Sequence, residues 1–90
     1  MRFIEGLPTF AVEVHSENDY VVAEFEMAAK RADYFGAGSI VVWDEDPIHE
    51  LVRKYQRNPP DQSVAFVRGD NADADPAVPA WRMAVDWIFA

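Results

Sequence analysis

The sequence contains no cysteine and no long apolar run. The lack of thiols excludes disulfides, zinc–thiolate sites and thiol nucleophiles. No apolar stretch approaches the roughly 20 residues that a membrane-spanning helix needs. The opening MRFIEGLPTF, with its early Glu and its Pro, is unlike a signal peptide. We therefore expect a soluble protein of the cytoplasm with no membrane association.

Basic residues are also scarce. The chain of 90 residues has 8 Lys and Arg against 16 Asp and Glu, which gives a formal net charge of −8. This charge repels nucleic acid on average, because phosphate binding needs basic side chains that displace counterions. It remains compatible with a local basic site. Half of the residues are hydrophobic, as in a globular fold, and the length predicts a single domain over residues 1–90 with a small core.

The first part of the chain predicts a strand followed by a helix. Residues 9–15 alternate in period two, with Phe10, Val12 and Val14 on one side and Thr9, Ala11, Glu13 and His15 on the other. The polar residues that follow include two good helix caps, Asn18 and Asp19.

Residues 20–35 have the spacing of a helix, and Gly36 is expected to be its left-handed C-terminal cap. A second set of side chains, Glu26, Lys30 and Tyr34, lies at intervals of four on another face. We expect the core-facing stripe to be apolar and to consist of Val21, Phe25, Ala28, Ala32 and Phe35.

The second part predicts further strands. Residues 40–43 are all apolar, as in a strand covered on both faces. The more polar residues 49–56 predict a strand nearer an edge. Residues 57–62 contain paired prolines and predict a loop, and residues 63–69 predict a third short strand. We expect residues 70–80 to be irregular, and residues 81–90 to form a strand or helical turn that covers one end of the core.

The order strand, helix, strand predicts a βαβ crossover with parallel pairing. The later strands predict an antiparallel extension. The expected fold is therefore a mixed sheet with one main helix on a face, in the α/β or α+β class.

Several segments in order resemble a known family. PTFAVEVHSEND, KRADYFGAG, VVWDEDP, VRKY and the closing AVPAWRMAVDWIF are similar to the second half of the Uma-type restriction endonuclease-like domains, within the PD-(D/E)XK nuclease superfamily. The resemblance runs from Gly6 onward. It implies a truncated restriction-endonuclease-like core that lacks the N-terminal half of the family domain. It also implies Mg²⁺-dependent cleavage of phosphodiesters in DNA.

The resemblance assigns roles to particular residues. Glu13 matches the family's glutamate and is the expected metal ligand and catalytic carboxylate. Lys30, four residues before Tyr34, matches the family's lysine and is the expected catalytic cation. His15 stands where the superfamily often has its lysine. Two features depart from the pattern: Thr9 stands where the family has an aspartate, and the upstream half of the family domain, with its additional acidic residue, is missing. Because one charged oxygen ligand and the upstream acid are missing, we expect weak or no cleavage by this chain.

Plainer interpretations compete with this one. Glu13 can be the solvated side of a strand, and Lys30 can form a surface pair with Glu26. The basic residues Arg53, Lys54 and Arg57 can meet phosphate, but we favour a solvated edge strand protected against aggregation. The tryptophans Trp43, Trp81 and Trp87, together with Phe89, are expected in the core.

The main alternative to a nuclease is a non-catalytic interaction or dimerisation module with the same fold. A domain of this size is expected to leave apolar surface uncovered and to bury it in a homodimer. A geometric expectation tests the site itself: Glu13 should lie on a central strand with its carboxylate directed towards Lys30.

Overall fold

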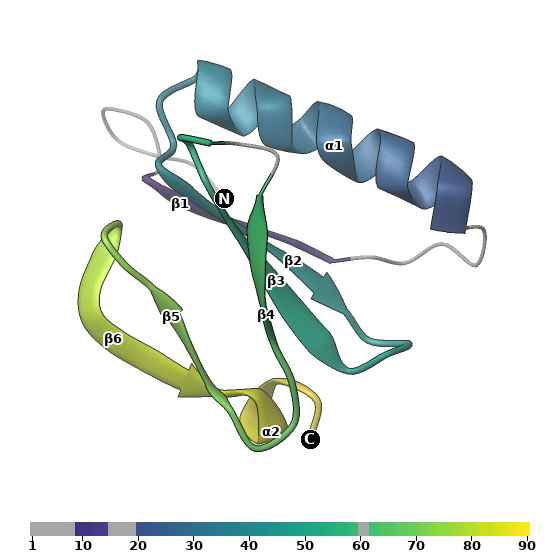
Figure 1. The fold of residues 1–90 in the computed structure, drawn as a ribbon, viewed down its shortest axis with the longest axis vertical. Helices are drawn as coiled ribbons and strands as arrows, with labels where there is room; N and C mark the ends of the chain where they lie inside the picture. Colours follow the sequence, from purple (N-terminus) through teal and green to yellow (C-terminus); the bar gives the residue numbers. More distant parts are fainter. Residues whose placement is uncertain (1–8, 15–19, 60–61) are drawn as a thin grey trace.

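We describe the protein from a computed structural model, in which residues 9–14, 20–59 and 62–90 are described. Figure 1 shows α1 lying over one side of a sheet, with a smaller pair of strands on the other side. The elements are β1 (Phe10–Val14), α1 (Tyr20–Gly36), β2 (Val41–Asp46), β3 (Leu51–Gln56), β4 (Ser63–Phe66), β5 (Asn71–Ala74), β6 (Val78–Ala84) and α2 (Val85–Ile88). The expected caps Asn18 and Asp19 and the candidate His15 lie outside the described residues.

The larger sheet has the strand order β1-β2-β3-β4. β1 and β2 run parallel and are joined through α1, while β2, β3 and β4 pair antiparallel. The second sheet contains the antiparallel pair β5 and β6. The predicted α+β fold with a mixed sheet and one main helix is confirmed. Two details were wrong: among the described strands β1 has a single neighbour rather than a central place, and the edge beside β3 is taken by β4.

Each face of the larger sheet has its own core. Towards the second sheet, a buried cluster contains Val41, Trp43, Val52, Ala72, Ala74 and Val85, with Phe10 and Trp81 packed against it. Towards α1, a second cluster contains Ala11, Phe35, Val42 and Tyr55. Successive residues of β2 therefore point into different cores, which confirms the prediction of a strand covered on both faces.

The helix α1 is rotated relative to its predicted orientation. Among the side chains of α1 from residue 24 onward, which the structure describes, the buried ones are Met27, Arg31 and Phe35, at intervals of four residues. Phe25 is 77% exposed, and Ala28 and Ala32, two other members of the predicted stripe, are exposed as well. The spacing of apolar residues did not predict this orientation, because a charged side chain, Arg31, occupies the middle of the buried face.

The turn after α1 also differs in detail from the prediction. Gly36 is the last helical residue, and the positive φ of 113° belongs to Gly38. The amide of Gly38 donates to the carbonyl of Phe35 (3.1 Å), and the amide of Ser39 donates to that of Tyr34 (2.9 Å). A residue with a side chain is strained at this φ, so the second glycine of the GAG sequence closes the helix.

The segment predicted to be irregular contains β5 and the beginning of β6. Ala72 and Ala74 are fully buried, while Asn71 is exposed, so the Asn-Ala-Asp-Ala sequence alternates as a strand does. The end of the chain combines β6 with α2, as expected. Trp87 is not in the core, however, because its residue is 78% exposed. Within the described residues, no helix has both the length and the apolar character to span a membrane.

Candidate functional site

The parallel crossover brings Glu13 of β1 under α1. Oε2 of Glu13 lies 3.7 Å from Nζ of Lys30. Oε1 of Glu13 accepts a hydrogen bond of 2.7 Å from the hydroxyl of Tyr34. Lys30 and Tyr34 are four residues apart and so project from the same side of the helix. The predicted direction of Glu13 towards Lys30 is therefore confirmed, and the predicted pair of Lys30 with Glu26 does not form.

Glu13 is largely covered whereas Lys30 is open to solvent. The Glu13 side chain is 18% exposed and the Lys30 side chain is 56% exposed. The hydrogen bond to Glu13 raises the pKa of Tyr34 above its ordinary value, and burial and the negative charge of Glu13 act in the same direction. The arrangement thus holds a carboxylate in a fixed position beside an accessible ammonium group, which could meet an anion such as a phosphate.

A second carboxylate, which the sequence did not single out, lies next to this one. Asp44 on β2 is the register partner of Glu13, so both side chains emerge on the α1 face. Asp44 is buried and forms an ion pair with the guanidinium of Arg31. Arg31 also donates to Glu24 (2.9 Å), and its guanidinium carbon lies 3.8 Å from the centre of the Tyr55 ring.

Burial acts to lower the pKa of Arg31, but the hydrogen bond with Glu24 and the charge of Asp44 outweigh it and leave that pKa raised. In the sequence, only the positions of Asp44 and Arg31 relative to their apolar neighbours pointed to this ion pair. Asp44 directly follows the apolar run of β2, and Arg31 is spaced by four from both Met27 and Phe35.

The acidic groups do not fit a magnesium site. Among the described residues, no group of three or more His, Asp or Glu side chains could hold a metal ion. Glu13 contributes one carboxylate, Asp44 is paired with Arg31, and Thr9 offers a hydroxyl where a carboxylate was expected from the sequence. Mg²⁺ usually keeps several waters and is bound through one or two carboxylates. Here Glu13 already lies near Lys30 and Asp44 is paired with Arg31, so these oxygens are poor ligands for the ion.

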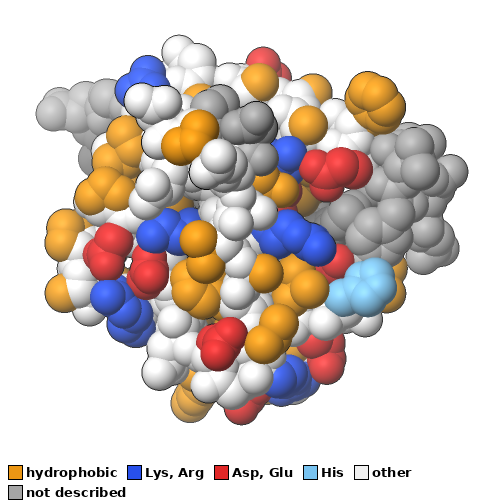
Figure 2. All heavy atoms as spheres, in the orientation of Figure 1, with side chains coloured by type: hydrophobic (Ala, Val, Ile, Leu, Met, Phe, Trp, Pro, Cys, Tyr) orange, Lys and Arg blue, Asp and Glu red, His pale blue; other side chains and the backbone are white. Residues whose placement is uncertain are grey.

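The basic residues of β3 lie on opposite faces of the sheet, because Arg53 is the register partner of Asp44 and Lys54 that of Trp43. Lys54 is buried and pairs with Asp73 of β5, while Arg57 is exposed beyond the end of the strand. The prediction of a solvated edge strand is wrong for Lys54, since β3 lies inside the sheet. On the face seen in Figure 2, basic side chains are scattered among acidic and apolar ones and form no continuous stripe.

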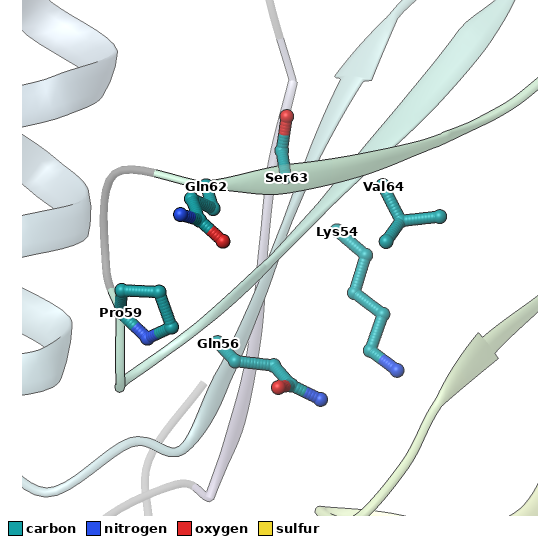
Figure 3. Close-up of a pocket in the computed structure, with 6 residues that line it drawn as sticks. All are labelled: Lys54, Gln56, Pro59, Gln62, Ser63 and Val64. Carbon is teal, nitrogen blue, oxygen red and sulfur yellow. The ribbon is translucent and has the colours of Figure 1, made fainter.

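A cavity of about 170 Å³ lies near the ends of β3 and β4, shown in Figure 3. Lys54 and Trp43 are register partners, so this cavity opens on the side of the sheet opposite to Glu13. The ammonium group of Lys54 is already paired with Asp73. The cavity is therefore separate from the Glu13 site. Its lining consists of Lys54, Gln56, Pro59, Gln62, Ser63 and Val64.

The fold is similar to that of a crystal structure from Anabaena variabilis ATCC 29413, whose description is "a putative nuclease belonging to DUF820". The TM-score is 0.66 and the sequence identity 16%, over 94% of this chain. The chain spans 45% of the length of that protein. No protein-family profile and no curated protein matches the sequence. At this identity the likeness establishes the fold, an α+β arrangement that matches about half of a nuclease-like structure.

Proposed function

We propose that the chain is a DNA endonuclease-like domain in which Glu13 and Lys30 mark the cleavage site. We further propose that it has little or no Mg²⁺-dependent activity by itself. The observation that carries the proposal is the contact of Glu13 with Lys30 and Tyr34 beneath α1, in a fold shared with a nuclease-like structure. The accessible ammonium of Lys30 is suited to hold a phosphate of the nucleic-acid backbone.

Three features support low activity. Thr9 does not supply the carboxylate expected at its position, and Arg31 engages Asp44, the register partner of Glu13. The net charge of −8 repels DNA, and this repulsion grows at low salt because the screening length increases. The fold is thus retained while the ligand set for a metal is incomplete.

A plasmid-nicking assay in Mg²⁺ or Mn²⁺ tests the proposal with wild type, Thr9→Asp, Glu13→Ala and two double variants that add Glu13→Ala or Lys30→Ala to Thr9→Asp. We expect no cleavage above background by wild type and a gain in Thr9→Asp, which restores a charged oxygen ligand. Adding Glu13→Ala or Lys30→Ala to Thr9→Asp should remove that gain. Strong nicking by wild type that Glu13→Ala abolishes would show that the site is complete.

A second candidate, a non-catalytic interaction or dimerisation module, is favoured by a different observation. Among the described strands β1 pairs with β2 alone, and it exposes Val12 (42%) and Val14 (54%) on the face opposite to Glu13. An exposed apolar edge is suited to pairing with a second copy of the chain. Sedimentation of wild type and Val14→Lys distinguishes the cases, because a dimer formed there should dissociate in the variant. If Thr9→Asp is inert and wild type is dimeric, this candidate replaces the nuclease.

A further inference from the structure

Arg31 is a buried arginine in the middle of the helix face that meets the sheet. Its side chain is only 10% exposed. The neighbouring buried residues of α1, Met27 and Phe35, are apolar. A charged group at such a position is costly unless it is paired and hydrogen-bonded. Arg31 therefore needs partners that come from elsewhere in the fold.

Three groups surround the guanidinium. Asp44 of β2 forms an ion pair with it from the sheet. Glu24 of α1 accepts a hydrogen bond from its Nη2 atom at 2.9 Å. The ring of Tyr55 on β3 lies against it at 3.8 Å, close enough for a cation–π contact. The planar, permanently charged guanidinium suits such a set of partners better than an ammonium group does.

Asp44, the partner of Arg31 on the sheet, lies beside Glu13. Asp44 and Glu13 are register partners on adjacent strands, whose backbones lie about 4.8 Å apart in a sheet. Negative charges on side chains of adjacent strands that share a face repel each other unless a cation lies near them. In this chain both are matched by cations of α1, since Lys30 lies near Glu13 and Arg31 pairs with Asp44.

We infer that the guanidinium of Arg31 is a built-in counter-cation, which neutralises Asp44 beside Glu13 in place of a bound divalent ion. This pairing explains why Glu13 and Asp44 do not fit a magnesium site, although β1 and β2 bring them onto the same face. Because the guanidinium is covalently attached to the helix, it competes with any ion from solution. The inference goes beyond the proposed function, as it concerns charge balance and holds whether or not the chain cleaves DNA.

The test replaces Arg31 with Met, which keeps the length of the side chain and removes its charge. Titration calorimetry with MnCl₂ should show weak binding to wild type and an affinity about tenfold or more higher for Arg31→Met, because the guanidinium no longer competes with the ion for Asp44. Arg57→Met is the matched control, since it makes the same change of charge at an exposed residue. Adding Asp44→Asn to Arg31→Met should remove the gain.

If Arg31→Met is unfolded in the absence of metal, circular dichroism replaces calorimetry. Mn²⁺ should then restore the folded spectrum, whereas NaCl of equal ionic strength should not. A folded Arg31→Met protein that binds Mn²⁺ no more tightly than the Arg57→Met control overturns the inference, and so does an unfolded one that Mn²⁺ does not rescue. Neither readout depends on cleavage, so this result is independent of the nicking assay.

Discussion

Lys54 on β3 forms an ion pair with Asp73 on β5 and so connects the two sheets. The two residues are 19 positions apart in the sequence. The Lys54 side chain is 9% exposed and that of Asp73 24% exposed. Asp73 also accepts a hydrogen bond from the amide of Asp75 at 3.1 Å. Since the carbonyl of Asp73 accepts a bond from the indole of Trp43 (2.8 Å), this residue fixes the place of β5 against the larger sheet.

Replacing Lys54 with Met should therefore destabilise the fold. The substitution leaves the partly buried carboxylate of Asp73 without its main partner, and we expect the free energy of unfolding to fall by about 1–3 kcal/mol. Urea unfolding measures the change. Arg57→Met, at an exposed position, is the control and should change stability by no more than about 0.5 kcal/mol. Equal effects of the two variants would contradict a structural role for the ion pair.

The same pair predicts a dependence on pH. Burial acts to raise the pKa of Asp73, but the hydrogen bonds from Lys54 and from the amide of Asp75, with the charges of Lys54 and Arg82, leave it lowered. A lowered pKa in the folded state means that the carboxylate stabilises the fold above its unfolded pKa of about 3.9. This contribution is lost as the pH falls through the lower, folded value.

Urea unfolding of wild type and Asp73→Asn over a series of acidic pH values checks this expectation. The difference in stability between them should be constant near neutral pH and should shrink as the pH falls below the ordinary range of an aspartate. A difference that persists unchanged to the lowest pH would show that the charge of Asp73 does not stabilise the fold.

The tryptophans provide a test of the core. Trp43 is 2% exposed, and its ring centre lies 5.1 Å from that of Phe10 and 5.3 Å from that of Trp81. Trp43→Ala should cost about 3–5 kcal/mol, a large share of the total stability of a domain this small. Trp87→Ala should stay within about 0.5 kcal/mol, because its side chain is exposed. Thermal unfolding followed by circular dichroism compares them, and similar losses in both would contradict the packing described here.

The sequence predicted the parts of the fold that local patterns determine. The alternation around Glu13, the helical spacing after it and the apolar run ending at Trp43 correspond to β1, α1 and β2. The approach of Glu13 to Lys30 followed from this order, because a crossover helix packs back on its strand. The role of these residues in cleavage stays a proposal.

Other features depend on partners that are distant in the sequence. Lys54 is buried because β5 places Asp73 against it, and Arg31 is buried because β2 places Asp44 beneath it. No local rule indicates that a lysine or an arginine will be covered. β5 was missed because its inward residues, Ala72 and Ala74, are small and carry little of the hydrophobic signal that marks a strand.

The last prediction concerns Tyr34 and Glu13. If Glu13 were a solvated residue of the strand, Tyr34 would ionise near its ordinary pKa of about 10. In the structure Tyr34 donates to Glu13, and this bond, together with burial and the charge of Glu13, raises the pKa of Tyr34. A raised pKa in the folded state stabilises the fold below the unfolded value, and this stabilisation is lost as the pH rises through the folded value.

The absorbance of the phenolate, taken as the difference between wild type and Tyr34→Phe, should therefore show a titration above the ordinary range. In a Glu13→Gln background the pKa of Tyr34 obtained from the same difference should fall towards its ordinary value, because the negative charge is gone. Tyr34→Phe should lower the free energy of unfolding at neutral pH by about 0.5–1.5 kcal/mol. An unshifted titration that Glu13→Gln leaves unchanged would mean that Glu13 is not held by Tyr34 in solution. The carboxylate would then lack the fixed position on which the proposed site depends.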